Sequence, residues 1–281
     1  MSFGDLTRIN TNLQAISSLN ALQRVNSQLG IRQLRLATGS KINRAEDDSA
    51  GYTIAKKMQA RVRGQAKALD NIGDAKSMLT VGEGSLNSVM DILQNMKEKA
   101  VQAANDTLGS DERGAIKNEL DALSAEIGDI LGGTTFNGTS LFSSGGGGTS
   151  FTFQVNSEDG DVFVASIGTV GVGVSGMSVG SGDLAVTNAS TAGASLRKIG
   201  DAINTISSRL ASIGDSQKRL TFKQENLTVS MNNYEAARSR IEDADFAKEQ
   251  MEIIKLQILQ QTGTAALAQA NMGPQSILSL F

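Results

Sequence analysis

Two long segments carry apolar residues seven positions apart in paired rows, and this periodicity limits the fold more than any other feature of the sequence. In the first segment the rows are Ile72, Leu79, Leu86, Leu93 and Ala100, and Ala75, Gly82, Val89, Met96 and Ala103. In the second they are Leu196, Ile203, Leu210, Gln217, Gln224 and Met231, and Ile199, Ile206, Ile213, Leu220, Leu227 and Tyr234. Two rows offset by three residues form the seam of a coiled coil, so both segments are predicted to be long helices that pack along one narrow face.

A narrow apolar stripe does not stabilise a helix in water by itself, because its burial has to offset an ordering cost of about 1 to 2 kcal/mol per residue. Each helix therefore requires a partner. Helical segments flank the middle of the chain on both sides, and the simplest topology pairs the first with the last and the second with the penultimate. The predicted fold is mainly α, with long antiparallel coiled-coil-like helices from both termini in two stacked layers and a small β-hairpin region in the middle of the chain.

Gln217 and Gln224 interrupt the apolar seam of the second segment. Two interpretations stay open. Polar residues buried in a coiled coil can fix the register of its helices, or both side chains face solvent because neighbouring rows form the core.

The two ends of the chain carry helical patterns of their own. Their apolar positions, which we expect to pack subunits together in an inner layer, are Leu6, Ile9, Leu13, Ile16, Leu22, Val25 and Leu29, and Met251, Ile254, Ile258 and Leu278. A layer of two helices has little core of its own, so we expect it to gain order from neighbouring copies in an assembly. The last helix is predicted to end at Gly273-Pro274.

Between about residues 134 and 193 the composition changes to Gly, Ser, Thr and Val. The alternating runs FTFQV and DVFVASI, joined by a turn at 158–160, predict a β-hairpin. The segment GTVGVGVSGMSVGSG is of low complexity and is either irregular or weakly paired. Asn137-Gly138-Thr139 matches the sequon for N-linked glycans, which we discount.

The composition disfavours an enzyme. The chain contains no Cys, no His and no Trp, which excludes disulfides and Cys or His metal sites and removes the usual proton-transfer side chain, so no cofactor is expected. A net charge of -3 with interspersed signs gives no nucleic-acid footprint. No apolar run is long enough to insert into a membrane, and the start of the sequence lacks a signal peptide, which by itself predicts a cytosolic protein.

A polar segment from Thr38 to Gly51 separates the first two helical patterns and is predicted to be a linker. Its acidic residues Glu46, Asp47 and Asp48 lack the alternating ligand spacing of a calcium loop. We expect them instead to pair with arginines such as Arg44 and to fix the joint between two domains.

The segment INTNLQAISSLNALQRVNSQL and the following RLATGSKINRAEDDSAGYTIA, within residues 9–55, resemble the N-terminal signature of bacterial flagellins. The last segment, SRIEDADFAKEQMEIIKLQILQQTGTAALAQANMGPQSILSLF at 239–281, resembles the C-terminal signature of the same family. With LQNMKEKAVQAAN at 93–105, the resemblance covers about three quarters of the chain. It implies a short flagellin with little or no outer domain.

The resemblance implies a structural subunit that polymerises into the flagellar filament for swimming, without enzymatic activity. It replaces the cytosolic prediction with secretion to the flagellum, through type III export of the unfolded chain, which needs no cleaved signal peptide. The implied partners are further copies of the chain, an export chaperone, the export apparatus, the filament cap and hook-junction proteins.

Family architecture assigns residues 1–44 and 240–281 to an inner filament-core domain. It assigns 45–239 to a second domain, with helices at 56–104, 112–131 and 195–235 and the β-region at about 134–193.

The same resemblance places Gln94, Asn95, Glu98 and Lys99 where a vertebrate Toll-like receptor senses flagellins. Asn95 stands where an arginine is usual and Lys99 where a leucine is usual. Losing a guanidinium and an apolar anchor predicts weak recognition by the receptor.

Two alternatives to a filament subunit stay open. One is a hook-filament junction protein, which shares the terminal layout, although the C-terminal match favours flagellin. The other is an intracellular coiled-coil scaffold, which would not form filaments of uniform diameter.

Overall fold

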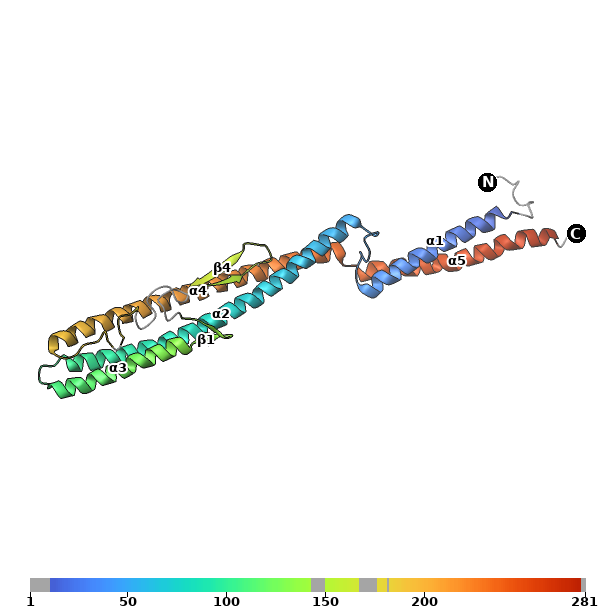
Figure 1. Ribbon diagram of the computed structural model, residues 1–281. Coiled ribbons are helices and arrows are strands. Elements are labelled where there is room, and N and C mark those ends of the chain that lie inside the picture. Colours follow the sequence, from blue (N-terminus) through green and yellow to red (C-terminus); the bar gives the residue numbers. More distant parts are fainter. Residues whose placement is uncertain (1–10, 143–149, 167–175, 181, 279–281) are drawn as a thin grey trace. The chain divides into compact units, whose positions relative to one another are not determined.

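The computed structural model describes residues 11–142, 150–166, 176–180 and 182–278, with the backbone alone from 273 onward (Figure 1). The helices are α1 (Leu13–Thr38), α2 (Ser49–Ala103), α3 (Ser110–Gly133), α4 (Ala189–Glu242) and α5 (Phe246–Leu278). The strands are β1 (Thr135–Phe136), β2 (Thr139–Ser140), β3 (Ser150–Gln154) and β4 (Val162–Ser166). The predicted fold class, mainly α with small hairpins in the middle of the chain, is confirmed.

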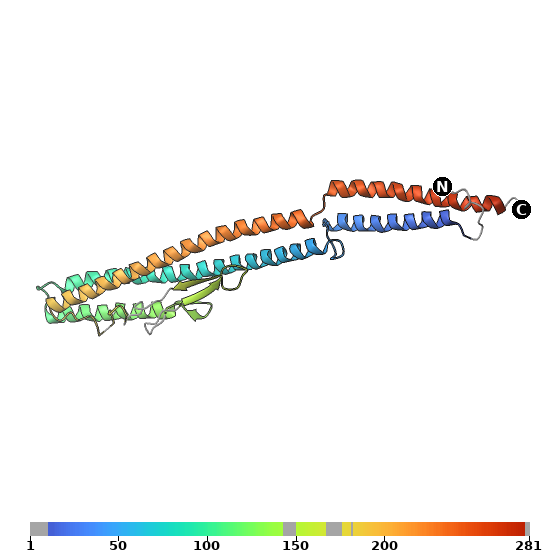
Figure 2. The same cartoon turned by 90° about the horizontal axis from the view of Figure 1, so that it is seen from above.

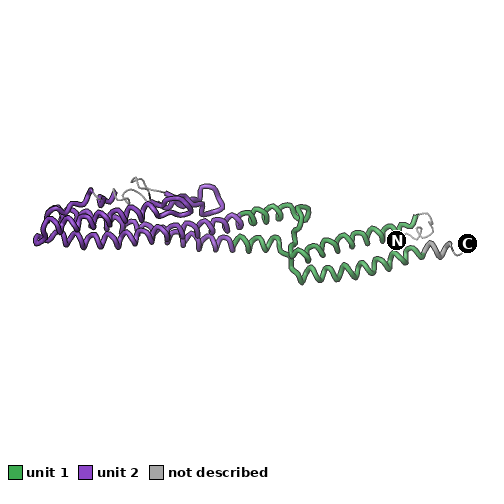
Figure 3. The backbone as a smooth tube through the Cα atoms, turned by 60° about the horizontal axis from the view of Figure 1, so that its bottom comes forward, with its two compact units in different colours: residues 1–60, 233–281 green, residues 61–232 purple. Residues whose placement is uncertain are grey.

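The chain divides into two compact units, one of residues 1–60 and 233–281 and one of residues 61–232 (Figure 3). Each unit is described by itself. The domain boundaries after residues 44 and 239 stay a prediction.

The larger unit, residues 61–232, is built around three helical segments that run side by side in both views of the ribbon (Figures 1 and 2). The predicted seam of α2 is confirmed, because Ile72, Leu86, Leu93 and Ala100 are completely buried. On α4 the row that begins at Ile199 forms the core, while the companion row that begins at Leu196 is only partly buried.

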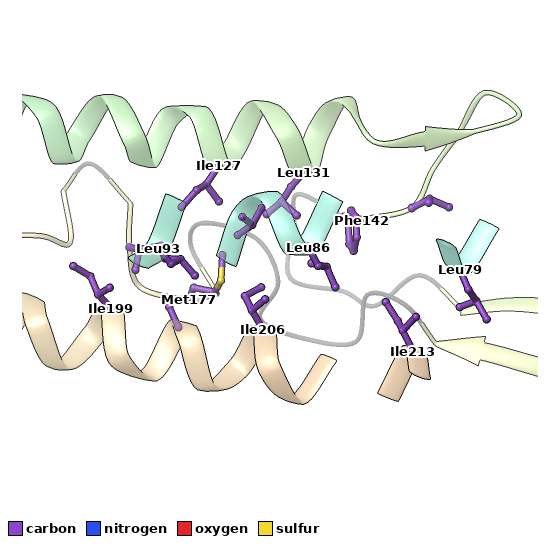
Figure 4. Close-up of a cluster of buried hydrophobic side chains, with 14 of the residues drawn as sticks. Leu79, Leu86, Leu93, Ile127, Leu131, Phe142, Met177, Ile199, Ile206 and Ile213 are labelled. Atoms are coloured by element: carbon purple, nitrogen blue, oxygen red, sulfur yellow. The ribbon is translucent and has the colours of Figure 1, made fainter. Parts of the chain in front are cut away.

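A close-up of this core shows side chains from all three helices meeting along its length (Figure 4). Leu86 and Leu93 of α2 lie between Ile127 and Leu131 of α3 on one side and the isoleucines of α4 on the other (Figure 4). Full burial of a Leu or Ile side chain contributes about 1.5 to 3 kcal/mol, so this continuous cluster gives the larger unit a core of its own.

The segment after the second hairpin also enters the core, which the sequence did not reveal. Met177, Val179, Leu184 and Val186 are at most 5% exposed. The connection is held to α4 by Ser195, whose Oγ donates to the Ala185 carbonyl at 2.8 Å. Its small and polar neighbours hid these apolar side chains from a periodicity search. Residues 167–175 of the same low-complexity segment lie outside the described residues.

Two antiparallel hairpins follow α3. The predicted hairpin is confirmed as β3 and β4, with Phe153 opposite Phe163 and a turn in which Gly160 has φ +86°. A shorter hairpin of β1 and β2 turns at Asn137 and Gly138, where φ is +49° and +76°. Positive φ at both turn residues is typical of a type I′ turn, for which Asn-Gly is the strongest sequence signal.

The smaller unit contains α1 and α5, which lie side by side and antiparallel (Figures 1 and 2). It also contains the start of α2 and the end of α4. The linker is shorter than predicted: α1 ends at Thr38 and is capped by Gly39, whose φ of +70° suits glycine, and α2 already begins at Ser49. The Asp48 carboxylate caps α2 by accepting from the Gly51 amide at 2.9 Å, which allows the earlier start.

The prediction that the last helix ends at Gly273-Pro274 is wrong, because α5 continues to Leu278. A proline inside a helix has no N–H for the carbonyl four residues before it, here that of Ala270. The Nδ2 of Asn12 donates to this carbonyl at 2.8 Å. A side chain from the opposite end of the sequence thus replaces the lost hydrogen bond.

Of the two glutamines in the α4 seam, neither is fully buried. Gln224 is exposed, and Gln217 is half-buried and donates to Glu83 Oε2 at 2.9 Å. The buried polar contact between α2 and α4 is instead made by Gln65, 4% exposed, which donates to Ser230 Oγ at 3.0 Å. Neither glutamine is a buried polar residue of the core, but both contact α2, because Gln224 Oε1 accepts from Lys76 at 3.4 Å as Gln217 bonds Glu83.

Candidate assembly interface

Within the smaller unit, α1 and α5 meet along two matching heptad rows. On α1 the inward positions are Ala15, Ser18, Leu22, Val25, Leu29, Arg32 and Leu36, and on α5 they are Glu249, Ile253, Leu256, Gln260, Gly263, Leu267 and Ala270. A Cβ at Gly263 would lie 3.4 Å from Leu22 Cδ1, so the small residue permits a close approach of the helices. These rows account for one face of each helix only.

Polar contacts fix the register of this helix pair. Asn12 bonds Ala270 near one end, and Gln260 Nε2 donates to Asn26 Oδ1 at 2.8 Å in the middle. Near the other end, Nη1 of Arg32 donates to both carboxylate oxygens of Glu249, at 2.9 and 3.0 Å. Glu249 is 5% exposed, and its buried carboxylate is bound by Arg32, with Nη1 of Arg35 3.9 Å away.

Both helices carry a second apolar face that is left exposed. The exposed residues are Leu13, Ile16, Leu19, Ile31 and Leu34 on α1, and Met251, Ile254, Ile258, Leu259 and Met272 on α5. A helix that is apolar on more than one face is normally buried on more than one face. Contiguous exposed apolar side chains of this kind mark an interaction surface.

The structure therefore divides the predicted packing residues into two groups. Leu22, Val25 and Leu29 are half-buried and line the α1–α5 contact. The second group is exposed on the outer faces and consists of Leu13, Ile16, Met251, Ile254 and Ile258. Leu6 and Ile9 lie outside the described residues, as does the side chain of Leu278. Contacts of these residues between subunits stay a prediction.

Sequence reasoning missed the buried row of α5, which includes Ile253, Leu256 and Ala270. The row formed by residues 251, 258, 265 and 272 contains two methionines and an isoleucine, so the sequence pattern indicates it as the packed row of this helix. The true inward row contains Glu249, Gln260 and Gly263, which lower its mean hydropathy. A search for a partner to the polar residues of α1, such as Arg32, could have identified it.

The predicted linker residues form a compact turn beside α1. The Asp47 carboxylate accepts from the amides of Asn43 and Arg44, both at 3.0 Å, and lies 3.8 Å from Arg35. These two amides, together with the positive charge of Arg35, hold the pKa of Asp47 below its ordinary value of 3.8. Arg44 pairs with Glu46 at 3.0 Å, but both side chains are largely exposed, so this pair stabilises little.

A recess of about 490 Å³ lies between this turn and the outer row of α1. It is lined by Ser27, Gly30, Ile31, Leu34, Arg35, Asn43, Arg44, Glu46 and Asp47. Its walls combine apolar side chains with charges of both signs, which suits a protein side chain as an occupant.

The linker is tied to the junction of α4 and α5. The Lys41 amide donates to the Glu242 carbonyl at 2.6 Å, and Ser40 forms a bridge with Asp243. Arg238 binds the carboxylates of Glu235 and Glu242, and its hydrogen bond lowers the pKa of Glu235. The two connections of the smaller unit are thereby held together by backbone contacts.

The predicted receptor residues lie on α2 in the larger unit. Gln94, Asn95 and Glu98 are exposed, whereas Lys99 is half-buried and forms an ion pair with Glu119 of α3 at 2.7 Å. The lysine that stands in place of the usual leucine is thus engaged within the subunit.

Among the described residues, no three acidic side chains are grouped so that they could hold a metal ion. In the same part of the chain, none of the helices combines the length and the apolar character needed to cross a membrane.

Comparison with known proteins identifies the family to which the chain belongs. The model of the bacterial flagellin N-terminal helical region matches residues 9–145, and the model of the C-terminal helical region matches residues 196–281. The chain belongs to the bacterial flagellin family. The matched flagellin regions contain α1, α2, α3 and α5, and with them both outer apolar faces of the smaller unit.

Curated relatives match over nearly their whole length. The chain is similar to flagellin FlaB1 of Treponema pallidum, with 34% identity over 97% of this chain and 99% of that protein. It is 35% identical to the flagellin of Bacillus subtilis over 98% of this chain and 99% of that one. The crystal structure of Bacillus cereus flagellin aligns with a TM-score of 0.47 and 27% identity, covering 60% of this chain and 94% of that chain.

Proposed function

We propose that the outer apolar faces of α1 and α5 are the surfaces through which this flagellin polymerises. The chain is a structural subunit of the flagellar filament, and its main partner is itself. The observation that supports the proposed surfaces is that Ile16 and Ile258 are 50% and 55% exposed although they belong to amphipathic helices that already have a packed face. Neighbouring copies of the same helices would bury both rows.

The mechanism is polymerisation by mass action. Burying a Leu, Ile or Met side chain that is exposed in the free subunit contributes about 1.5 to 3 kcal/mol. Several such side chains on each subunit, repeated in every copy, offset the loss of translational freedom on assembly. Catalysis forms no part of this function, in keeping with a chain that has neither His nor Cys.

The experiment compares two variants of α5. Ile258→Asp places a charge on the proposed interface, and Gln257→Glu adds one at an exposed polar position next to it. We expect sedimentable filaments of uniform diameter from the unmodified chain and from Gln257→Glu, and none from Ile258→Asp at the same concentration. Filaments of normal length from Ile258→Asp would exclude this face as the contact.

We also propose that the chain uses the export chaperone, type III export apparatus, cap and hook-junction proteins of its family, which rests on membership alone. Recognition by the vertebrate receptor is proposed to be weak, because Asn95 and Lys99 lack the usual groups. The double variant Asn95→Arg/Lys99→Leu is expected to signal more strongly than the unmodified protein in a reporter-cell assay. Equal signals would contradict the proposal.

A further inference from the structure

The methionines of the described residues differ sharply in exposure. Met251 and Met272, both on α5, are each 65% exposed. Met78, Met96 and Met177 of the larger unit are at most 5% exposed, and Met58, Met90 and Met231 are half-buried. An oxidant in solution therefore reaches the two sulfurs of α5 and hardly reaches those of the core.

The two exposed methionines share one face of α5. They belong to the row Met251, Ile258, Ala265 and Met272, whose members are seven residues apart and all exposed. The opposite face of the helix, which includes Ile253 and Leu256, is buried against α1. Both sulfurs thus lie on the outer face of α5, away from the contact that holds the helix pair together.

We propose that Met251 and Met272 form an oxidation-sensitive site that controls assembly, and this inference rests on the proposed polymerisation through the outer face of α5. Hydrogen peroxide transfers one oxygen atom to each thioether, so methionine becomes the sulfoxide and peroxide is reduced to water. The sulfoxide is polar and chiral, and it does not replace an apolar side chain in a tight contact. An oxidised subunit keeps its fold, because the buried sulfurs of the core are not reached, but it adds poorly to a filament.

The reaction acts on free subunits only. Once the outer face is covered by a neighbouring copy, peroxide no longer reaches either sulfur. Oxidation therefore blocks addition of new subunits without dissolving filaments that already exist. Methionine sulfoxide reductases, one for each epimer of the sulfoxide, reverse the change.

The test treats the full chain with dilute hydrogen peroxide and measures oxidation at each methionine by mass spectrometry and the critical concentration for polymerisation by sedimentation. We expect Met251 and Met272 to oxidise first and the critical concentration to rise about tenfold or more. Circular dichroism is expected to remain unchanged, and treatment with both reductases to restore assembly. Normal polymerisation of a sample fully oxidised at both positions would overturn the proposal.

Matched variants separate this site from general damage. Met251→Leu/Met272→Leu keeps apolar volume without sulfur, and its critical concentration before treatment is expected to stay the same after peroxide. Met78→Leu/Met96→Leu is expected to remain as sensitive as the unmodified chain. Loss of assembly in the first variant after peroxide would contradict the proposal.

Preformed filaments provide a second readout. Their Met251 and Met272 are expected to oxidise at least about tenfold more slowly than in free subunits, because the sulfurs are covered. Equal rates would overturn the proposal. If the untreated chain forms no filaments at all, the proposed polymerisation is refuted. If the untreated and the oxidised chains assemble equally well, only the proposed effect of oxidation is refuted.

Discussion

At the scale of single residues, a few polar side chains hold the smaller unit in register. Asn12 acts twice: its Oδ1 accepts from the Ala15 amide at 3.0 Å and caps α1, while its Nδ2 bonds the Ala270 carbonyl that Pro274 leaves without a backbone partner. Arg32 donates to the buried carboxylate of Glu249, and the carboxylate of Asp47 accepts from two backbone amides. Each of these contacts joins segments that are distant in the sequence or closes a turn.

The two roles of Asn12 can be separated. Asn12→Asp keeps an oxygen that caps α1 but removes the donor to Ala270, so we expect the last turns of α5 to lose about 1 kcal/mol of protection while α1 is unaffected. Asn12→Ala removes the cap and the donor together, and it is expected to weaken the start of α1 and the end of α5. Hydrogen exchange of the amides in each helix measures the difference. Equal loss in α1 for both variants would contradict the assignment.

Removing Arg32 leaves the buried carboxylate of Glu249 without its main partner. We expect Arg32→Ala to destabilise the α1–α5 pair by about 1 to 3 kcal/mol, since the buried carboxylate loses both hydrogen bonds and keeps only Arg35, 3.9 Å away. Hydrogen exchange at Ile253 and Leu256 reports on this contact. Lys255→Ala is the control, because Lys255 and Glu252 form an exposed pair at 3.8 Å, and it is expected to have almost no effect.

The linker turn is expected to respond to acid through Asp47. Because the pKa of this carboxyl is lowered in the folded chain, its contribution to stability is fully present above 3.8, the ordinary value, and is lost as pH falls through the lower folded pKa. Asp47→Asn lacks the contribution at every pH. NMR of the Asn43 and Arg44 amides should therefore distinguish the two proteins at pH 6 and no longer do so in strong acid. A difference that persists there would refute the role of the carboxylate.

At the scale of elements, the helices of the larger unit follow their heptad rows closely, whereas α1 and α5 do not reveal which row faces inward. The reason is physical. In α2 and α4 one continuous stripe is apolar, and only scattered apolar residues such as Val81 and Phe222 lie outside it, so burial favours one face. In α1 and α5 two stripes are apolar, and the polar residues Arg32, Glu249 and Gln260 lie in the stripe that is buried within the subunit.

The core of the larger unit provides a direct test of the seam. Leu86→Ala is expected to lower its free energy of unfolding by about 2 to 5 kcal/mol, because it opens a cavity between α2, α3 and α4. Val81→Ala, at an exposed position of the same helix, is expected to change it by less than about 0.5 kcal/mol. Urea denaturation followed by circular dichroism measures both. A small effect at Leu86 would show that this layer of the core is loosely packed.

At the scale of the whole molecule, the two compact units differ in how far the burial of their apolar side chains depends on other copies of the chain. The larger unit buries a continuous cluster from three helices and a connecting segment, while the helix pair of the smaller unit leaves its outer faces exposed. We expect deletion of residues 241–281 to abolish polymerisation and to leave the larger unit folded. Sedimentation and urea denaturation of the truncated chain test both parts, and filaments from this chain would count against the assembly surfaces proposed above.

The sequence by itself determined the family, the helical character, the seams of α2 and α4 and the β3–β4 hairpin, because these depend on local periodicity and on signatures at both ends of the chain. Only the tertiary structure decided which faces of α1 and α5 meet, how Asn12 allows α5 to continue past Pro274, and that Met177, Val179, Leu184 and Val186 enter the core. These features depend on contacts between residues far apart in the chain. A pattern within one segment does not specify which of two apolar stripes finds its partner in the same subunit and which remains for another copy.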